Sequence, residues 1–116
     1  MARAAAALLA LALAPGVHAA ERAFTLAAVG GAVPPAQQAL RVAKGDTVVV
    51  SLASDQPGEV HLHAYRQHAK VAPAQPASWR FTAHATGRFR IEWHAAGDTS
   101  AGHHRAPLAT LEVMPK

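Results

Sequence analysis

Two histidines stand one residue apart near the middle of the chain, in the stretch GEVHLHAY from Gly58 to Tyr65. Side chains at positions i and i+2 of a β-strand point to the same face, with Cα atoms about 6.5–7 Å apart. Two imidazoles at that spacing can bind one cation, and imidazole suits copper, zinc and nickel. His61 and His63 are therefore candidate metal ligands. The alternative is that they are solvated, or hydrogen-bonded across a sheet.

Three more histidines follow at positions that a fold could bring near this pair. His94 ends the alternating stretch RFRIEWH, and His103 and His104 lie in the loop that follows it. That loop, Ala95–Pro107, is long for so small a domain, and long loops are often functional. We predict a metal site of His61, His63, His94 and one of His103 or His104, with Glu59 as a further ligand or as the group that orients a ring. His68 and His84 lie near predicted turns, and we expect them to be solvated.

The composition narrows the chemistry of such a site. The chain has eight His and no Cys, which excludes a thiolate ligand, a thiolate nucleophile and any disulfide. Copper(II) in a tetragonal nitrogen and oxygen site is favoured over zinc, because copper(II) binds most tightly of the divalent series. Ligation requires neutral imidazole, so binding should weaken below about pH 6.5.

Other classes of function have little support. The net charge of +4 comes from Lys and Arg that do not cluster, so nucleic acid is not an expected partner. An enzyme needs a nucleophile with a base, or paired carboxylates. Asp98, Ser100 and His103 are available in the loop only, and we do not predict an enzyme.

The first residues resemble an export signal. Arg3 precedes an apolar run of eleven residues, 4–14, and a small-residue cleavage site follows Pro15 and Gly16. The run is short for a membrane-spanning helix. We predict a signal peptide at residues 1–19, a single domain at 20–116, a periplasmic or secreted location in a bacterium, and no membrane span after cleavage.

Short apolar stretches separated by Gly and Pro turns indicate an all-β sandwich. A helical turn is expected only in Pro34–Leu40. We also expect a hairpin-like turn at 44–46. Tyr65–Lys70 should be a polar strand end or an edge strand. The predicted strands are Arg22–Val29, Ala39–Ala43, Thr47–Ser54, Gly58–Tyr65, Ala77–His84, Arg88–His94 and Leu108–Met114.

Alternation of apolar and polar residues assigns the faces of one of these strands and gives conflicting signals in another. Within Arg88–His94, Phe89, Ile91 and Trp93 should face the core. Within Gly58–Tyr65 the pattern conflicts. Hydropathy would bury the face of Val60, Leu62 and Ala64, but the large Tyr65 shares the other face with His61 and His63.

The order of these motifs resembles the cupredoxin family, and more narrowly its exported EfeO-type and plastocyanin-like domains. The resemblance runs from Phe24 to Pro115 and is carried by KGDTV, by the histidine of the following strand, and by GRFRIEW. It implies a Greek-key β-sandwich of six to eight strands. In copper-binding members, the first ligand matches His61 and the loop ligand matches His103 or His104.

The sulfur ligands of those copper centres are missing here. Trp93 stands at the position of the Cys, and Pro107 is near that of the Met, since Met114 comes too late. The resemblance therefore implies copper handling, delivery or buffering rather than blue-copper electron transfer, which depends on the Cys–copper bond. Because Trp93 would plug the pocket, the alternative is a metal-free module that contacts a membrane or periplasmic protein.

Overall fold

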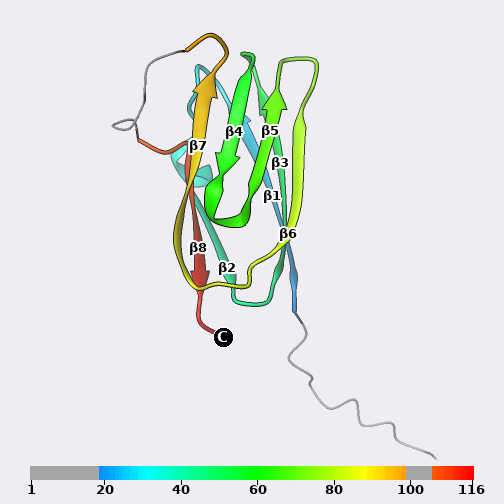
Figure 1. Cartoon of the computed structure of the whole chain (residues 1–116), viewed down its shortest axis with the longest axis vertical. Coiled ribbons are helices and arrows are strands. Elements are labelled where there is room, and N and C mark those ends of the chain that lie inside the picture. The colour runs from blue at the N-terminus through cyan, green and yellow to red at the C-terminus, as the bar shows by residue number, and fades with distance from the viewer. Residues whose placement is uncertain (1–18, 99–105) are drawn as a thin grey trace, which may run out of the picture.

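The computed structural model describes residues 19–98 and 106–116, and these form a β-sandwich (Figure 1). The predicted signal peptide, residues 1–19, falls almost entirely outside the described part and stays a prediction. No helix in residues 19–98 or 106–116 has the length and apolar character needed to cross a membrane. The strands are β1 (Glu21–Ala28), β2 (Ala39–Ala43), β3 (Thr47–Ser54), β4 (Gly58–Leu62), β5 (Gln67–Val71), β6 (Ala77–Thr82), β7 (Gly87–Ala95) and β8 (Ala109–Met114).

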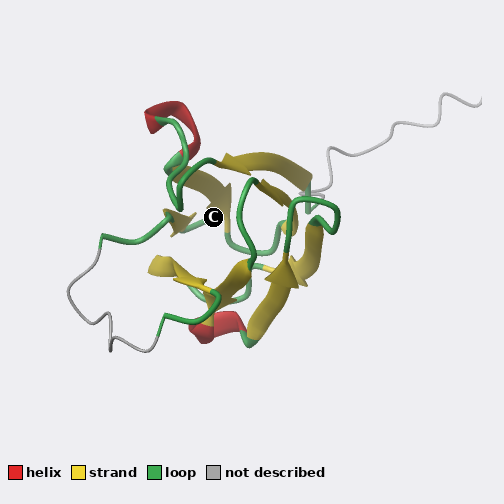
Figure 2. Ribbon diagram, turned by 90° about the horizontal axis from the view of Figure 1, so that it is seen from above, coloured by secondary structure: helices red, strands yellow, loops and turns green. Residues whose placement is uncertain are grey.

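The strands form two sheets that face each other. One sheet has the order β1-β3-β6, and the other has the order β2-β8-β7-β4-β5. β1 pairs with β3 and β2 pairs with β8 in parallel, while the other pairs are antiparallel. Seen from above, the strands surround a central core (Figure 2). The predicted all-β sandwich is confirmed.

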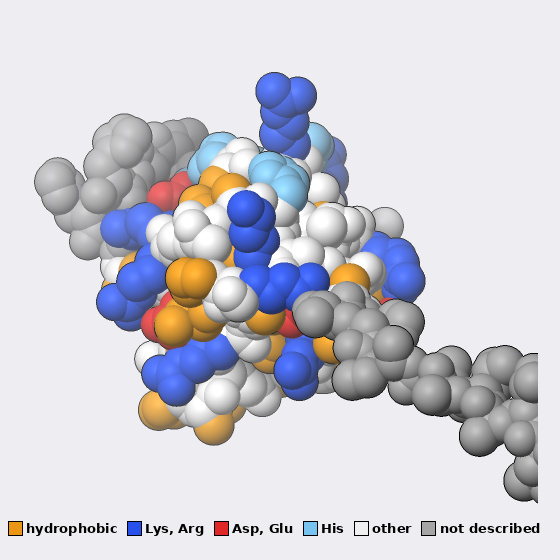
Figure 3. All heavy atoms as spheres, turned by 90° about the horizontal axis from the view of Figure 1, so that it is seen from below, with side chains coloured by type: hydrophobic (Ala, Val, Ile, Leu, Met, Phe, Trp, Pro, Cys, Tyr) orange, Lys and Arg blue, Asp and Glu red, His pale blue; other side chains and the backbone are white. Residues whose placement is uncertain are grey.

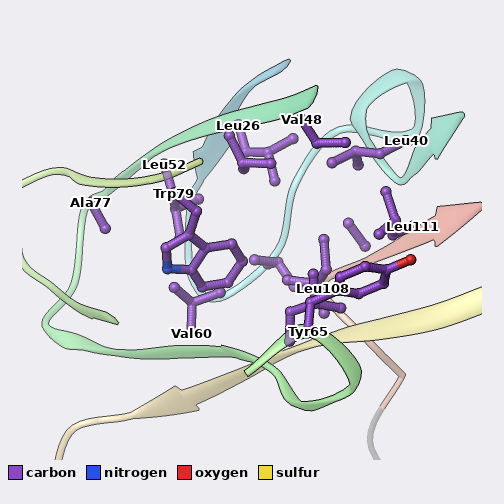
Figure 4. Packing of buried hydrophobic residues seen from close by; sticks show 14 of the residues in the cluster. Leu26, Leu40, Val48, Leu52, Val60, Tyr65, Ala77, Trp79, Leu108 and Leu111 are labelled. Atoms are coloured by element: carbon purple, nitrogen blue, oxygen red, sulfur yellow. The ribbon is translucent and has the colours of Figure 1, made fainter. Parts of the chain in front are cut away.

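The core lies between the inner faces of the sheets. In Figure 4, Trp79 points from β6 between the sheets toward Val60 of β4, with Leu26 and Leu52 on the side of the smaller sheet. The largest fully buried side chains come from both sheets, as alternation along each strand requires. They are Leu26, Leu40, Val48, Val60, Leu62, Ile91 and Leu111.

The turn at 44–46 connects the two sheets. β2 and β3 have the predicted bounds, but they belong to different sheets, so the expectation of a hairpin-like turn was wrong. The Asp46 carboxylate holds this crossing, because it accepts hydrogen bonds from the backbone N–H groups of Ala43 (2.8 Å) and Ala20 (3.2 Å). The Ala43 bond, supported by the Ala20 bond and by Arg22, lowers the pKa of Asp46 in spite of its burial.

The stretch Gly58–Tyr65 is strand for only part of its length. β4 ends at Leu62, and a 3-10 turn, η2, covers His63–Tyr65 before Arg66 adopts a left-handed backbone (φ 54°). The turn rotates Tyr65 into the core, where its hydroxyl donates to the Ala85 carbonyl at 2.8 Å. Ala64, which hydropathy alone would bury with Val60 and Leu62, is exposed, because strand alternation stops before it. The helical turn expected in Pro34–Leu40 is confirmed as the 3-10 turn η1 (Pro35–Gln37).

Candidate metal site

The candidate ligands lie on the outer face of the larger sheet, across β5, β4 and β7. Gly58, Val60 and Leu62 of β4 are buried, so Glu59 and His61, which alternate with them, point outward. Register then sets their neighbours. His61 is paired with Glu92 on β7 and with His68 on β5, and Glu59 is paired with His94 on β7. The topology thus brings together side chains from three strands.

His61 is the centre of this cluster. Its ring centroid lies 5.0 Å from that of His94, with the two planes nearly perpendicular at 81°. The His63 ring lies 5.3 Å from it in a stacked arrangement, and the His68 ring lies 6.1 Å away. Three of the five predicted ligands, His61, His63 and His94, are therefore neighbours. His103 and His104 lie outside the described residues.

Two carboxylates contact the rings of the cluster. Nε2 of His61 lies 3.3 Å from Oε2 of Glu59. Nε2 of His63 and Nε2 of His94 both face Oε2 of Glu92, at 3.3 Å and 3.8 Å. One oxygen of Glu92 is thus the common neighbour of two imidazole nitrogens from different elements.

Solvent reaches most of this cluster. The exposed fraction of the side chain is 23% for His61, 45% for His94 and 71% for His63. In the view of Figure 3, histidine side chains are visible at the molecular surface, and Lys and Arg are scattered and not gathered into one patch. In residues 19–98 and 106–116, no group of three or more His, Cys, Asp or Glu side chains is arranged to hold a metal ion. The cluster is an open surface of potential ligands.

The inner face of the same strands is closed. Trp93 is paired with Val60 and points inward. Its indole lies against two glycines. A Cβ at Gly58 would come within 2.6 Å of the Trp93 ring, and one at Gly31 within 2.9 Å. The indole therefore fills the space on the inner face of the β4–β7 pair next to Gly58.

Two correspondences drawn from the cupredoxin resemblance are incompatible in the structure. Trp93, at the position of the copper-binding Cys, faces inward, whereas His61, matched to the first ligand, faces outward. Two ligands of one ion cannot project from opposite faces of a sheet. With no thiolate in the chain and an indole filling the inner position, the residues present do not fit a blue-copper centre.

Sequence reasoning missed two members of the cluster. His68 is exposed near a turn as expected, but the sequence did not show that it is paired with His61 on the edge strand β5. Glu92 was not among the predicted ligands. The signal for both is cross-strand register, which depends on which strands pair. His84, the other residue expected to be solvated, is exposed and lies apart from the cluster, 4.9 Å from the Tyr65 ring.

Comparison with known proteins identifies the fold. No protein-family model matches the chain, and no curated protein sequence matches it. Among solved structures, the periplasmic domain of subunit II of cytochrome oxidase from Bradyrhizobium japonicum has a TM-score of 0.61 at 14% identity, covering 85% of this chain and 88% of that one. A copper-binding protein solved in its apo form has a TM-score of 0.58 at 11% identity, covering 84% and 91%.

Larger oxidases contain a similar unit. The blue copper oxidase from Nitrosomonas europaea has a TM-score of 0.62 at 19% identity over 83% of this chain. The chain spans only 39% of that oxidase, and 65% of a matching chain of a heme-copper terminal oxidase. These likenesses show that the chain has a cupredoxin-like fold. The narrower likeness to EfeO-type domains stays a prediction.

Proposed function

We propose that the outer-face histidine cluster binds copper(II), and that the protein serves copper handling, delivery or buffering rather than electron transfer. The observation that carries this proposal is the position of His61, whose ring lies 5.0 Å from that of His94 and 5.3 Å from that of His63. His61 of β4 thus has one imidazole neighbour from β7 and one from η2.

These distances suit shared ligation. At a metal–nitrogen distance of about 2.0 Å, each ring centroid lies about 3.2 Å from the ion. Two rings on one ion are then separated by about 4.5 Å when they bind at a right angle and by about 6.4 Å when they bind opposite each other. Both observed separations lie inside that interval, but the His63 ring is stacked on that of His61 at 20° and would have to turn before both could bind one ion. Binding would turn the Nε2 atoms of His63 and His94 from Glu92 onto the ion.

The donor set favours copper over zinc. Nitrogen and carboxylate donors without sulfur suit copper(II), which binds most tightly among the common divalent ions. Glu92 and Glu59 would supply negative charge, either as oxygen ligands or as acceptors that orient the rings. Such an open site would exchange its ion readily, as delivery or buffering requires.

The proposed location is the periplasm or the cell exterior. The predicted signal peptide supports it, and so does the likeness to a periplasmic domain of cytochrome oxidase. A copper-handling protein placed there would meet metal ions and periplasmic or membrane proteins as partners.

A second candidate function is a metal-free module that binds a periplasmic or membrane protein. Trp93 favours it, because the indole fills the inner position where a blue-copper protein has its thiolate. The contacts from Glu59 and Glu92 also give the histidines polar neighbours without a metal.

Copper titration separates the two functions. The protein, purified without a polyhistidine tag, is titrated with copper(II) and then with zinc(II) by calorimetry at neutral pH. Replacing His61 and His63 together with Ala should weaken copper binding by at least about tenfold, since removing ligands lowers affinity strongly. His84→Ala is the matched control, because it removes a histidine that lies outside the cluster. Equal weak binding by all three proteins would favour the module.

A further inference from the structure

We propose that an arginine group on the outer face of the larger sheet binds an acidic segment of another protein. The group consists of Arg41, Arg88 and Arg90, with Glu112 between the first two. It lies on the same face as the histidine cluster, and the binding needs no metal. Only its link to copper exchange rests on the proposed function, for which it names the chemistry of the partner.

Sheet register gathers these arginines, although they are spread along the chain. Arg41 of β2 and Arg88 of β7 are both paired with Glu112 on β8, the strand between them. Arg90 comes two residues after Arg88 on β7 and points to the same face. Neighbouring strands lie about 4.8 Å apart and residues i and i+2 about 7 Å apart, so the three side chains begin within about 12 Å of one another.

The charges of this group do not cancel. Oε2 of Glu112 accepts a hydrogen bond from Nε of Arg41 at 2.9 Å, and Oε1 accepts one from Nη2 of Arg88 at 3.0 Å. One carboxylate thus serves two guanidinium groups. Its side chain is only 14% exposed, whereas those of Arg41 and Arg88 are 74% and 77% exposed. Solvent therefore meets mainly positive charge, on planar groups whose N–H donors match the geometry of carboxylates.

A hollow of about 300 Å³ connects the arginine group to the histidine cluster. It is lined by His63, Ala64, Arg88, Phe89, Arg90 and Glu92. Along β7 the outer face then continues to His94, six residues after Arg88, which is about 20 Å of extended chain. A partner segment whose carboxylates contact the arginines would therefore place its following residues beside the proposed metal ligands.

The pattern of charge favours a protein segment over an anionic membrane. The arginine group is positive, but the histidine cluster beside it carries Glu59 and Glu92. A uniformly negative membrane surface would bring its charge against these two carboxylates, and like charges in contact are unfavourable. A protein segment can carry acidic side chains only where the arginines lie.

The test measures binding of a fluorescein-labelled oligoglutamate peptide to the untagged protein without metal. Fluorescence anisotropy is recorded at about 50 mM and about 500 mM salt, with an oligoglutamine peptide as the uncharged control. We expect oligoglutamate to bind at the lower salt concentration and to lose at least about tenfold in affinity at the higher one, because exposed charges are screened. No binding at the lower salt concentration would overturn the inference.

Charge reversal locates the surface. Arg88→Glu should weaken binding of oligoglutamate by at least about tenfold, because it replaces an attractive contact with a repulsive one. Arg80→Glu is the matched control and should retain affinity within about twofold. Arg80 is 64% exposed and its Nη1 lies 2.7 Å from Oε1 of Glu21, but it belongs to β6 in the smaller sheet. Equal losses would show that binding follows net charge, and would overturn the arginine group as the site.

Two further measurements complete the test. If circular dichroism shows that Arg88→Glu fails to fold, Arg88→Gln is compared with Arg80→Gln in its place. Vesicles of phosphatidylglycerol, with phosphatidylcholine as the neutral control, test the membrane. Tighter binding to phosphatidylglycerol than to oligoglutamate, lost in the Arg88 variant, would overturn the protein segment in favour of a membrane surface.

Copper titration separates this inference from the proposed function. Arg88→Glu should bind copper(II) within about twofold of the wild type, because Arg88 is outside the histidine cluster. Peptide binding in a protein that binds no copper would overturn the proposed function and support the docking surface. Copper binding without peptide binding would overturn the docking surface alone.

Discussion

The two faces of the β4–β7 pair differ in what surrounds their side chains. On the inner face, Trp93 lies against Gly58 so closely that a single added carbon would overlap the indole. On the outer face, Glu92, the neighbour of Trp93 in the chain, is paired in register with His61, and both contact other polar side chains. The β4–β7 pair therefore has closely packed side chains on its inner face and solvent-accessible polar side chains on its outer face.

This difference suggests that the inner face contributes to the stability of the fold and that the outer face carries the proposed metal binding. By the cupredoxin resemblance, the copper-binding Cys corresponds to Trp93 on this inner face. Here an indole packs at that position, and the histidines proposed as ligands lie on the other face. Substitutions on the inner face should then change the free energy of unfolding, and substitutions on the outer face should change metal affinity. The following predictions test this division.

The largest effect is expected from Gly58→Ala. The new Cβ would lie 2.6 Å from the Trp93 ring and 2.7 Å from the backbone oxygen of His94, and the backbone oxygen cannot move aside cheaply. Overpacking of this kind should lower the free energy of unfolding by about 3 kcal/mol, measured by urea denaturation.

Gly30→Ala is the control for that substitution. A Cβ at Gly30 meets no atom within 4 Å, and only its positive φ of 59° carries a cost, of about 1–2 kcal/mol. Equal losses in the two variants would show that the contact of Gly58 with Trp93 is not tight.

Trp93→Ala should have the next largest effect. Because the indole is only partly buried, its removal should cost about 2–3 kcal/mol, less than for a fully buried Trp. Copper affinity should stay within about twofold of the wild type, since the ligands point to the opposite face. Denaturation and calorimetric titration measure the two quantities, and a large loss of copper affinity would mean that the faces are coupled.

The inner face was the more predictable of the two from sequence. Strict alternation placed Phe89, Ile91 and Trp93 inside, and the bounds of β2 and β3 followed from apolar runs that end at turn residues. The outer cluster was less accessible, because it depends on the pairing of strands that are distant in sequence. His61 and His63 could be found by their spacing, whereas the partnership of His61 with His68 and Glu92 requires the register.

The end of β4 was unpredictable for a different physical reason. Alternation extended the strand to Tyr65, but the backbone leaves the strand after Leu62 and turns through η2 to the left-handed Arg66. Non-glycine residues rarely adopt that conformation, so the sequence around Arg66 did not predict the turn. The turn resolves the conflict in the sequence, because it buries Tyr65 and leaves His63 exposed.

Tyr65→Phe tests this turn and should have an intermediate effect. The hydroxyl donates to the Ala85 carbonyl at 2.8 Å and accepts from the Ala85 N–H at 3.2 Å. Its removal leaves two backbone groups without this partner, so we expect a loss of about 1–2 kcal/mol in the free energy of unfolding. A loss near zero would mean that solvent replaces the hydroxyl. Copper affinity should not change, because the ring faces the core.

Asp46→Asn should show its effect as a pH dependence. The pKa of Asp46 is lowered in the folded protein, chiefly by the hydrogen bond from Ala43. The carboxylate therefore contributes stability at neutral pH that is lost as the pH falls through the folded pKa, below the usual range for aspartate. Denaturation between neutral pH and strong acid should show a decline in the wild type, and a flatter profile in the variant. Equal slopes would contradict the role of Asp46.

The smallest change in stability is expected from His63→Ala, and it is the sharpest test of the division between the faces. The side chain of His63 is 71% exposed, and its Nε2 lies 3.3 Å from Oε2 of Glu92. An exposed pair of this kind contributes about 0–1 kcal/mol, so without metal the free energy of unfolding should change by no more than about 0.5 kcal/mol.

With copper present, the same two proteins should separate. An ion that binds only the folded state at a hundred times its dissociation constant stabilises that state by about 2.7 kcal/mol. If His63→Ala weakens binding tenfold, the same copper concentration stabilises the variant by about 1.4 kcal/mol. Thermal unfolding of both proteins with and without copper(II) therefore measures the contribution of His63 to binding apart from its contribution to folding. Equal copper-induced shifts would exclude His63 as a ligand, and a large difference without metal would mean that the outer face also holds the fold.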